Sequence, residues 1–530
     1  MLFTSYSFLG FIAVLFLLYY LIPRRMQWGL LLIASYLFYF IAGSSWLLYL
    51  AATTASTYFA ARRLQEVGER QKAYIKANKE RLSAEEKKAY KVKMKSRQRG
   101  WMLACLLLNL GILAVVKYTN FAIANINGLL RLTGSAARLD FWDIALPMGI
   151  SFYTFQALGY LIDVYRGTVA AEKNPFRLAL FVSFFPQLIQ GPISRFGDMA
   201  KSLYEEHAFE AKRFCYGLER ILWGYFKKLV IADRILMGVN TVIRDTETYQ
   251  GAYVFVGMLF YALELYADFT GGIDITIGIA QALGIQVKEN FNRPYFSKSV
   301  KEYWRRWHIT MGTWFTDYIF YPISVCKPML KLSRSARARL GENIGKRVPI
   351  YLSSFAVWLA TGIWHGASWN FVVWGLGNWA VIMVSQELEP LYARFHRRFD
   401  VRGKGWFKLF QVLRTILVMS CLRTFDCYRD VPLTFRMFGT MFTRWNWHIL
   451  WDGSLLGIGL SAADYVILLA GLAALVAVSL LQRRGSVRDR IAARPYPARF
   501  LVWYGLFLAV LLMGAYGVGY DASQFIYNQF

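Results

Sequence analysis

The segment Thr361–Asn370 reads TGIWHGASWN and lies between long apolar and aromatic stretches that carry no charge. A histidine at membrane depth must find a polar partner or line a wet cavity, and intramembrane ionisable residues are functional candidates for that reason. Imidazole also has the unperturbed pKa closest to neutrality, so His365 can take up and return a proton during group transfer. We interpret His365 as a catalytic candidate; its position alone leaves helix packing open as the alternative.

The composition predicts an all-α polytopic membrane protein. The 530 residues are 56% hydrophobic and 17% aromatic, which is too apolar for an ordinary soluble protein of this length. The net charge of +28 lies in blocks between hydrophobic segments, where orientation in the membrane explains it better than binding of nucleic acid does. The five cysteines have neither a disulfide pattern nor a metal-binding spacing, so we expect no metal.

The basic blocks predict which side of the membrane each loop faces. The charged segment 62–99 is expected to be a helical cytoplasmic insert. Three later blocks are expected on the same side: Lys327–Arg347, Arg394–Lys408 and Arg483–Arg499. About 10–12 transmembrane helices connect these blocks, and both termini, including the tail 517–530, are expected outside the cell.

Two segments of the single domain predicted for residues 1–530 are too polar to be ordinary spans. Phe181–Phe196 contains prolines and glutamines within an apolar run, which suggests a re-entrant segment walled by protein. The segment 290–308 is expected to be a cytoplasmic approach loop and amphipathic helix, whose aromatic residues suit the membrane interface.

Three carboxylates, Glu264, Asp268 and Asp274, lie within a hydrophobic stretch and must pair, become protonated or face water. A proton path is one interpretation. We expect structural ion pairs instead, because the sequence offers nearby bases, which are Lys227, Lys228, Arg234 and Arg293.

His308 follows a second aromatic and basic motif, WRRW at Trp304–Trp307. Arg305 and Arg306 have the planar fork geometry that binds phosphates, so with Trp304 they are candidates for binding a nucleotide-like donor. Anchoring of a helix end at the interface is the alternative, with Asp317 as a partner of one arginine. The chain has no G-x-S-x-G elbow, H-x-x-x-H pair or Rossmann fingerprint, which argues against hydrolases, metalloenzymes and dehydrogenases.

Together these motifs resemble the membrane-bound O-acyltransferase superfamily, in its bacterial branch of alginate, cellulose and peptidoglycan O-acetyltransferases and teichoic-acid D-alanyltransferases. The resemblance extends over nearly the whole chain. It departs from the usual pattern at the insert 62–99 and at Cys326–Arg347. The segments that carry it are Pro147–Phe155 (PMGISFYTF), Gln187–Ile193 (QLIQGPI), Asn290–Tyr295 (NFNRPY), Tyr303–Ile309 (YWRRWHI) and Gly362–Ala367 (GIWHGA).

The resemblance implies a ring of helices around a central tunnel, with His365 as the catalytic histidine and His308 as the second histidine. It implies that Tyr527, in the terminal F-x-Y-x-x-F, relays the acyl group. The implied co-substrate is an acyl-CoA, expected to be acetyl-CoA, with no tightly bound cofactor. The implied partners are an extracytoplasmic esterase-like protein and a polysaccharide acceptor at the bacterial cytoplasmic membrane.

Two alternatives stay open. Within the enzyme class, the chain could transfer D-alanine to teichoic acid from a carrier protein. In another class, a polysaccharide or lipid-carrier transporter could use the same buried charges and histidine to line a translocation path.

Overall fold

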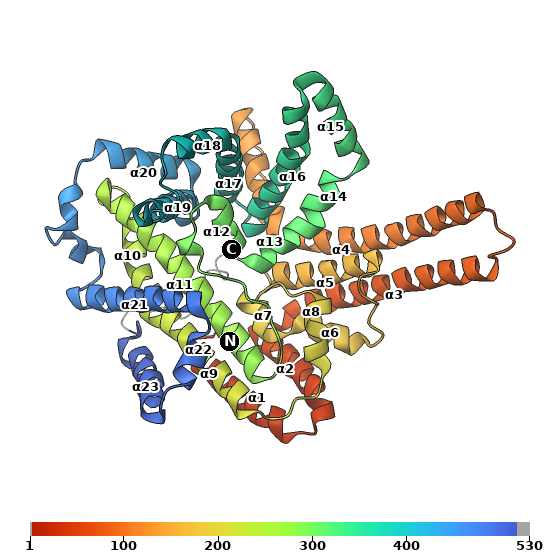
Figure 1. Cartoon of the computed structure of the whole chain (residues 1–530), viewed down its shortest axis with the longest axis horizontal. Coiled ribbons are helices and arrows are strands. Elements are labelled where there is room, and N and C mark those ends of the chain that lie inside the picture. Colours follow the sequence, from red (N-terminus) through yellow and green to blue (C-terminus); the bar gives the residue numbers. More distant parts are fainter. Residues whose placement is uncertain (1–2, 517–530) are drawn as a thin grey trace. The chain divides into compact units, whose positions relative to one another are not determined.

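The computed structural model describes residues 3–516, which fold into helices joined by loops, without a β-strand among them (Figure 1). Their contacts divide the chain into two compact units, whereas the sequence predicts one domain. One unit runs to Phe214 and includes Ala280–Lys288. The other comprises Cys215–Ile279 and continues from Glu289, so it contains both candidate histidines.

The first unit is built on a long helical hairpin. The segment 62–99 lies on this hairpin, formed by α3 and α4 (Figure 1), and is helical as expected. Ser83 begins α4 with a capping box, in which its Oγ accepts from the Glu86 amide at 3.1 Å. The helices are α1 (Tyr6–Leu21), α2 (Gln27–Ala42), α3 (Leu47–Ala77), α4 (Ala84–Leu132), α5 (Ile150–Arg166), α6 (Pro175–Ser183), α7 (Phe185–Gln190) and α8 (Phe196–Tyr204).

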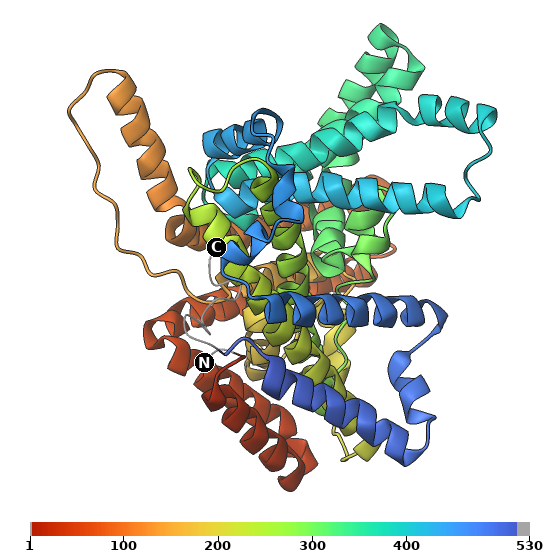
Figure 2. The same cartoon turned by 90° about the vertical axis from the view of Figure 1, so that its left-hand side faces the viewer.

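The second unit begins within α9 and ends, in its described part, with α21 and α23, the long blue helices that the short α22 connects in Figure 2. Its helices are α9 (Ala211–Tyr225), α10 (Asp233–Arg244), α11 (Ala252–Ala282), α12 (Val300–Arg306), α13 (Ile309–Phe315), α14 (Tyr321–Ser324), α15 (Lys327–Leu340), α16 (Glu342–His365), α17 (Trp369–Glu387), α18 (Glu389–Arg398), α19 (Gly405–Tyr428), α20 (Val431–Thr443), α21 (Ala462–Leu481), α22 (Val487–Ala492) and α23 (Tyr496–Met513).

Several helices have the length and composition of membrane spans. Within residues 3–516, six meet both criteria, and α1 is a shorter apolar helix. The expectation of an all-α polytopic membrane protein is confirmed, while the number of 10–12 spans and the direction of each stay predictions. The six are Arg24–Ala42, Ala84–Leu132, Ala252–Ala282, Gly405–Tyr428, Ala462–Arg484 and Tyr496–Met513.

The segment 181–196 is broken as its prolines predict. The end of α6, the six-residue α7 and the loop after it replace a continuous helix. The side chain of Gln187 is buried yet satisfied, because it accepts from Gln156 Nε2 at 2.9 Å and donates to Ser194 Oγ at 2.6 Å. Protein contacts therefore provide the polar partners that lipid could not.

Close backbone packing joins α9 to α11 in the second unit. A Cβ atom on Gly224 would lie 2.6 Å from the Gly271 carbonyl oxygen, and one on Gly278 would lie 2.8 Å from the Gly217 carbonyl oxygen. No side chain fits at these contacts, so glycine is required where the two helices touch. The packing brings Arg220 of α9 within hydrogen-bonding distance of Asp274 of α11.

We expect Gly271→Val to reduce the stability of the protein, because its side chain would push α11 away from α9. Overpacking of this kind costs about 1–3 kcal/mol, measured as a lower midpoint of thermal unfolding in detergent. Gly505→Val is the matched control in α23, where a Cβ atom meets nothing within 4 Å. Equal midpoints for the two variants would contradict the packing argument.

Candidate functional site

His365 is the last residue of α16, and the chain turns directly into α17. A Cβ atom on Gly366 would lie 2.1 Å from the Phe371 ring, so glycine allows this tight return. The imidazole centroid is 4.7 Å from that of Trp374 and 5.0 Å from that of Trp364. His365 is 8% exposed, so its ring lies in an aromatic enclosure close to the end of a helix.

His308 lies between α12 and α13 in the left-handed region, with φ 47°. Its Nδ1 is 3.3 Å from Asn290 Oδ1, an oxygen that also accepts from the Thr310 amide at 3.0 Å and from the Thr310 hydroxyl at 2.9 Å. Because an amide oxygen only accepts, we assign the proton to Nδ1 and an acceptor lone pair to Nε2. Nε2 is buried and has no hydrogen-bond partner among the described residues.

The environment of His308 disfavours its charged form. Burial, and secondarily the positive charge of Arg423, lower the pKa of His308 to about 3. The ring is therefore a neutral hydrogen-bond acceptor at physiological pH.

The structure brings the two predicted histidines next to one indole, that of Trp364. The Trp364 ring centroid is 6.1 Å from that of His308 and 5.0 Å from that of His365. The two motifs therefore lie next to each other in the structure.

Arg423 is a part of this site that sequence reasoning missed. Its guanidinium carbon lies 4.8 Å from the ring centroid of Trp374, 5.2 Å from that of Trp307 and 5.5 Å from that of Trp304. Arg423 is 5% exposed, and its Nη1 is 3.9 Å from Asp426 Oδ2. A charge inside the apolar span of α19 was the available signal, because intramembrane ionisable residues are rarely incidental.

The segment 290–308 differs from its expected interfacial form. Only Val300–Arg306 is an α-helix in the stretch before His308. Tyr303 and Trp307 are 1% and 2% exposed, so they belong to the protein core and do not anchor an interface. Their rings stack with centroids 5.4 Å apart, and aromatic packing of this kind outweighs an interfacial position.

The predicted donor-binding residues lie in different environments. Trp304 is part of the aromatic site, and its Nε1 donates to Asn378 Oδ1 at 3.0 Å. Arg306 pairs with Glu302 at 2.5 Å, one helical turn away, whereas Arg305 is exposed. Neither arginine lines the largest described cavity of this unit.

This cavity, of about 720 Å³, opens between α9, α11, the loop before α12 and the α21–α23 segment. Its apolar wall comes from α21 and α23, through residues such as Val478, Val502 and Leu506. Phe291 and Ile309 also line it, so the cavity reaches the immediate chain neighbour of His308.

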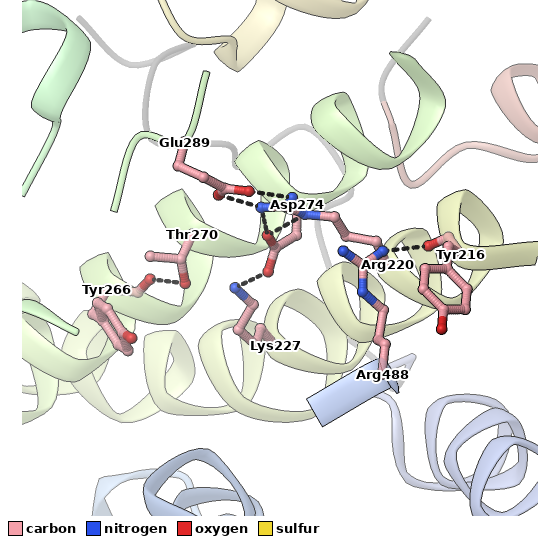
Figure 3. Close-up of polar contacts among 8 residues, drawn as sticks. All are labelled: Tyr216, Arg220, Lys227, Tyr266, Thr270, Asp274, Glu289 and Arg488. Carbon is pink, nitrogen blue, oxygen red and sulfur yellow. Dashed lines mark hydrogen bonds and ion pairs between the residues drawn. The ribbon is translucent and has the colours of Figure 1, made fainter. Parts of the chain in front are cut away.

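Paired charges lie at the cavity (Figure 3). Asp274 Oδ1 accepts from Arg220 Nε at 2.9 Å, and Asp274 Oδ2 accepts from Lys227 Nζ at 2.6 Å. Arg220 also donates to both carboxylate oxygens of Glu289 at 2.6 Å. Two bases thus balance two acids, and the burial of Asp274, Lys227 and Arg220 is offset by partners.

The ion pairs predicted from the sequence are confirmed for two of the three acids, whereas Glu264 and Arg293 form no salt bridge with a described residue. Asp274 pairs with Lys227, and Asp268 pairs with Lys228 at 2.6 Å. Arg234 was expected to pair with one of the three acids of α11, but it pairs with Asp464.

Further charged residues line the cavity outside this set of ion pairs. Arg293 is one of them, and burial together with the nearby positive charges of Arg306 and Arg483 lowers the pKa of Arg293. Burial also raises the pKa of Glu219, another lining residue, to about 7, so this acid is partly neutral at physiological pH. Arg488 also lines the cavity and donates to the Tyr216 carbonyl at 2.7 Å (Figure 3). With Glu219 partly neutral, Arg293 provides a cation that can bind an anion.

The absence of a metal and the acyl relay stay predictions from the sequence. Within residues 3–516 no group of three or more His, Cys, Asp or Glu side chains is arranged to hold a metal ion. Tyr527 and the tail 517–530 lie outside the described residues, so the acyl relay stays a prediction.

The chain is similar to known proteins. A family model described as MBOAT, membrane-bound O-acyltransferase family, matches residues 169–425. The chain is 32% identical over 448 residues to a protein named probable alginate O-acetylase AlgI from Azotobacter vinelandii, covering 84% of this chain and 79% of that protein. It is 30% identical over 325 residues to the peptidoglycan O-acetyltransferase of Helicobacter pylori, covering 56% and 58% of the two chains.

A more distant relative is the teichoic acid D-alanyltransferase of Bacillus subtilis, 28% identical over 244 residues, which cover 44% of this chain and 58% of that protein. These matches agree with the apolar helices of the chain. The chain belongs to the membrane-bound O-acyltransferase family and is a multi-pass membrane O-acyltransferase.

Proposed function

We propose that the protein moves an acetyl group from a cytoplasmic thioester, acetyl-CoA, toward a hydroxyl of a cell-envelope or secreted polysaccharide outside the membrane. The observation that supports this most directly is the position of His365 and His308 next to Trp364. The relatives named for alginate and peptidoglycan O-acetylation support acetyl as the acyl group and a polysaccharide as the acceptor.

In this proposal His365 is the general base. It takes the proton of the acceptor hydroxyl while the hydroxyl oxygen attacks the thioester carbonyl carbon. The carbon–sulfur bond then breaks, and the imidazolium returns the proton to the leaving thiolate, so the atoms and charges balance. The end of α16 favours this transient cation, because the C-terminus of a helix carries partial negative charge.

The neighbours of His365 suit the charge that develops during the reaction. Trp374 Nε1 is a buried N–H with no hydrogen-bond partner among the described residues. It belongs to the ring 4.7 Å from His365, so it is available to a carbonyl oxygen that becomes negative. His308 is too weak a base to take the proton, and its bare Nε2 would position a donor N–H or hydroxyl group.

The cavity that Arg293 lines is our candidate entrance for the donor. Arg293 would attract the phosphates of CoA, and the lining residues Phe291 and Ile309 lead toward His308. The basic block Arg483–Arg499 predicts that this cavity faces the cytoplasm. Arg305 and Arg306 remain the alternative placement from the sequence.

On the outer side the immediate acceptor is proposed to be Tyr527, a partner protein of the esterase type or the polysaccharide itself. The two rival functions differ in their chemistry. Release of the CoA thiol from acetyl-CoA by the purified protein with its acceptor separates acetyl transfer from transport, and the lack of transfer from a D-alanyl carrier excludes D-alanylation.

We expect His365→Ala to lower acetyl transfer by about 10²–10⁴-fold, the contribution typical of a general base. The measurement is acetylated polymer formed from labelled acetyl-CoA, alongside the yield of folded protein in the membrane. His448→Ala is the matched control, because that histidine is on the surface of the same unit, with its side chain 60% exposed. Unchanged transfer by the His365 variant would remove it from the reaction.

We expect His308 to make the fold sensitive to acid. Its pKa in the folded protein, about 3, is below the ordinary 6.5, so protons bind more readily to the unfolded chain. The resulting stability is fully present above pH 6.5 and is lost as the pH falls toward 3. Between pH 7 and 5 this loss amounts to about 2 kcal/mol.

His308→Gln removes this titration, so the variant should lose about 2 kcal/mol less stability than the natural protein over the same range. Chemical unfolding in detergent at pH 7, 6 and 5 measures the difference. His448→Gln serves as the exposed control, for which no change is expected. If both variants follow the pH dependence of the natural protein, His308 is not held neutral by the fold.

We expect Arg293→Gln to raise the KM for acetyl-CoA by about 10-fold, because it removes a charge-assisted contact to phosphate. The value of kcat should stay nearly constant, since the side chain binds the donor far from the reacting bond. Arg305→Gln is the comparison, as this exposed arginine lies outside the cavity. A rise in KM for the Arg305 variant alone would move the donor site to the WRRW motif.

A further inference from the structure

A second cavity in the same unit, of about 320 Å³, is separate from the histidines and from the proposed donor cavity. It lies between the second half of α10, the first half of α11 and the end of α19. Its polar lining includes Asn240, Arg244, Tyr261, Glu264, Asp426, Tyr428 and Arg429.

Two carboxylates in this lining are incompletely satisfied. Glu264 and Asp426 are each 3% exposed. Glu264 Oε2 and Asp426 Oδ1 are buried and accept no hydrogen bond from any described residue. A buried acceptor without a donor is costly, and native proteins usually provide a partner. A ligand in the cavity that both residues line could donate hydrogen bonds to these two oxygens.

The kind of ligand follows from the groups that surround it. Carboxylate oxygens accept from hydroxyl groups, the amide of Asn240 both donates and accepts, and the guanidinium groups of Arg244 and Arg429 donate. The described residues offer no cluster of three or more ligands for a metal ion. A cavity of about 320 Å³ with donors and acceptors on several sides suits one hydroxyl-rich ring, such as a sugar unit.

The position of the cavity fits an acceptor. The helix α19 leaves the basic block Arg394–Lys408, which is predicted to be cytoplasmic, and the cavity lies at its other end. The cavity is therefore on the predicted outer side.

A continuous set of contacts connects this cavity to His365, the catalytic candidate. Asp426 Oδ2 lies 3.9 Å from Arg423, the Arg423 guanidinium lies 4.8 Å from the Trp374 ring, and that ring lies 4.7 Å from the ring of His365. A ligand bound in the cavity can thus influence the Trp374 ring, which packs against His365.

We infer that this cavity is a subsite for a sugar unit of the polysaccharide acceptor, with Glu264 and Asp426 accepting hydrogen bonds from its hydroxyl groups. The inference rests on the proposed function for the identity of the acceptor. Its binding chemistry stands on the two unsatisfied carboxylate oxygens and the cavity.

The test is direct binding of oligosaccharides to the full chain in lipid nanodiscs, without donor. The probes are unacetylated alginate oligomers and soluble peptidoglycan fragments, with binding measured by titration calorimetry. We expect the natural protein to bind one of them and Glu264→Gln and Asp426→Asn to weaken that binding by about 10-fold or more. Glu247→Gln is the matched control, because its side chain is 77% exposed and pairs with Arg436.

Asn240→Trp gives an independent variant, which fills the cavity from its wall and leaves both carboxylates in place. It should also lose binding of the oligosaccharide. Binding that is unchanged in the folded carboxylate variants or in Asn240→Trp would overturn the subsite, as would the failure of the natural protein to bind either probe.

The result is distinguishable from failure of the proposed function. If His365→Ala still transfers acetyl groups while the carboxylate variants lose sugar binding, the subsite stands and the catalytic assignment falls. If His365→Ala is inactive while all variants bind sugar equally, the catalytic assignment stands and the subsite falls.

Discussion

One buried cation connects the parts of this protein that carry chemistry. The guanidinium of Arg423 lies against Trp304, Trp307 and Trp374 and beside Asp426, with 5% of the residue exposed. A buried charge costs several kcal/mol unless it is compensated, and each cation–π contact returns only about 0.5–2 kcal/mol. Several rings and a carboxylate must therefore converge on the same point, which fixes α12, α17 and α19 relative to one another.

This convergence gives two histidines different tasks. His308 is deeply buried, and Arg423 adds a positive charge near it, so its pKa falls to about 3 and the ring stays neutral. His365 lies at the end of a helix, next to Trp374, where a transient positive charge is favourable. The same residue type thus has two roles because the surroundings differ. His308 is a hydrogen-bond acceptor that positions a group, and His365 is the proposed base.

The charges of the second unit follow a consistent pattern. Where acids and bases meet in equal number, as in the set around Asp274 and Arg220, they stabilise the packing of α9 on α11. Other charged groups that line the two cavities lie outside these pairs. The positive charge of Arg293 suits a phosphate-bearing donor, and the open oxygens of Glu264 and Asp426 suit a ligand that donates hydrogen bonds.

Local patterns in the sequence determined the helices, because hydrophobic length and charge blocks act over neighbouring residues. The charged segment 62–99 is helical in α3 and α4, the polar segment 181–196 is broken between α6 and α7, and the pairing of Asp274 with Lys227 was predictable from an apolar stretch that needs a counter-charge. The GIWHGA motif likewise indicated His365 as the catalytic candidate. Tertiary structure alone decided that Tyr303 and Trp307 face the core, that Asn290 sets the tautomer of His308, and that Arg423 joins both motifs. These contacts connect residues far apart in the chain, and burial, which no local pattern encodes, sets their energies.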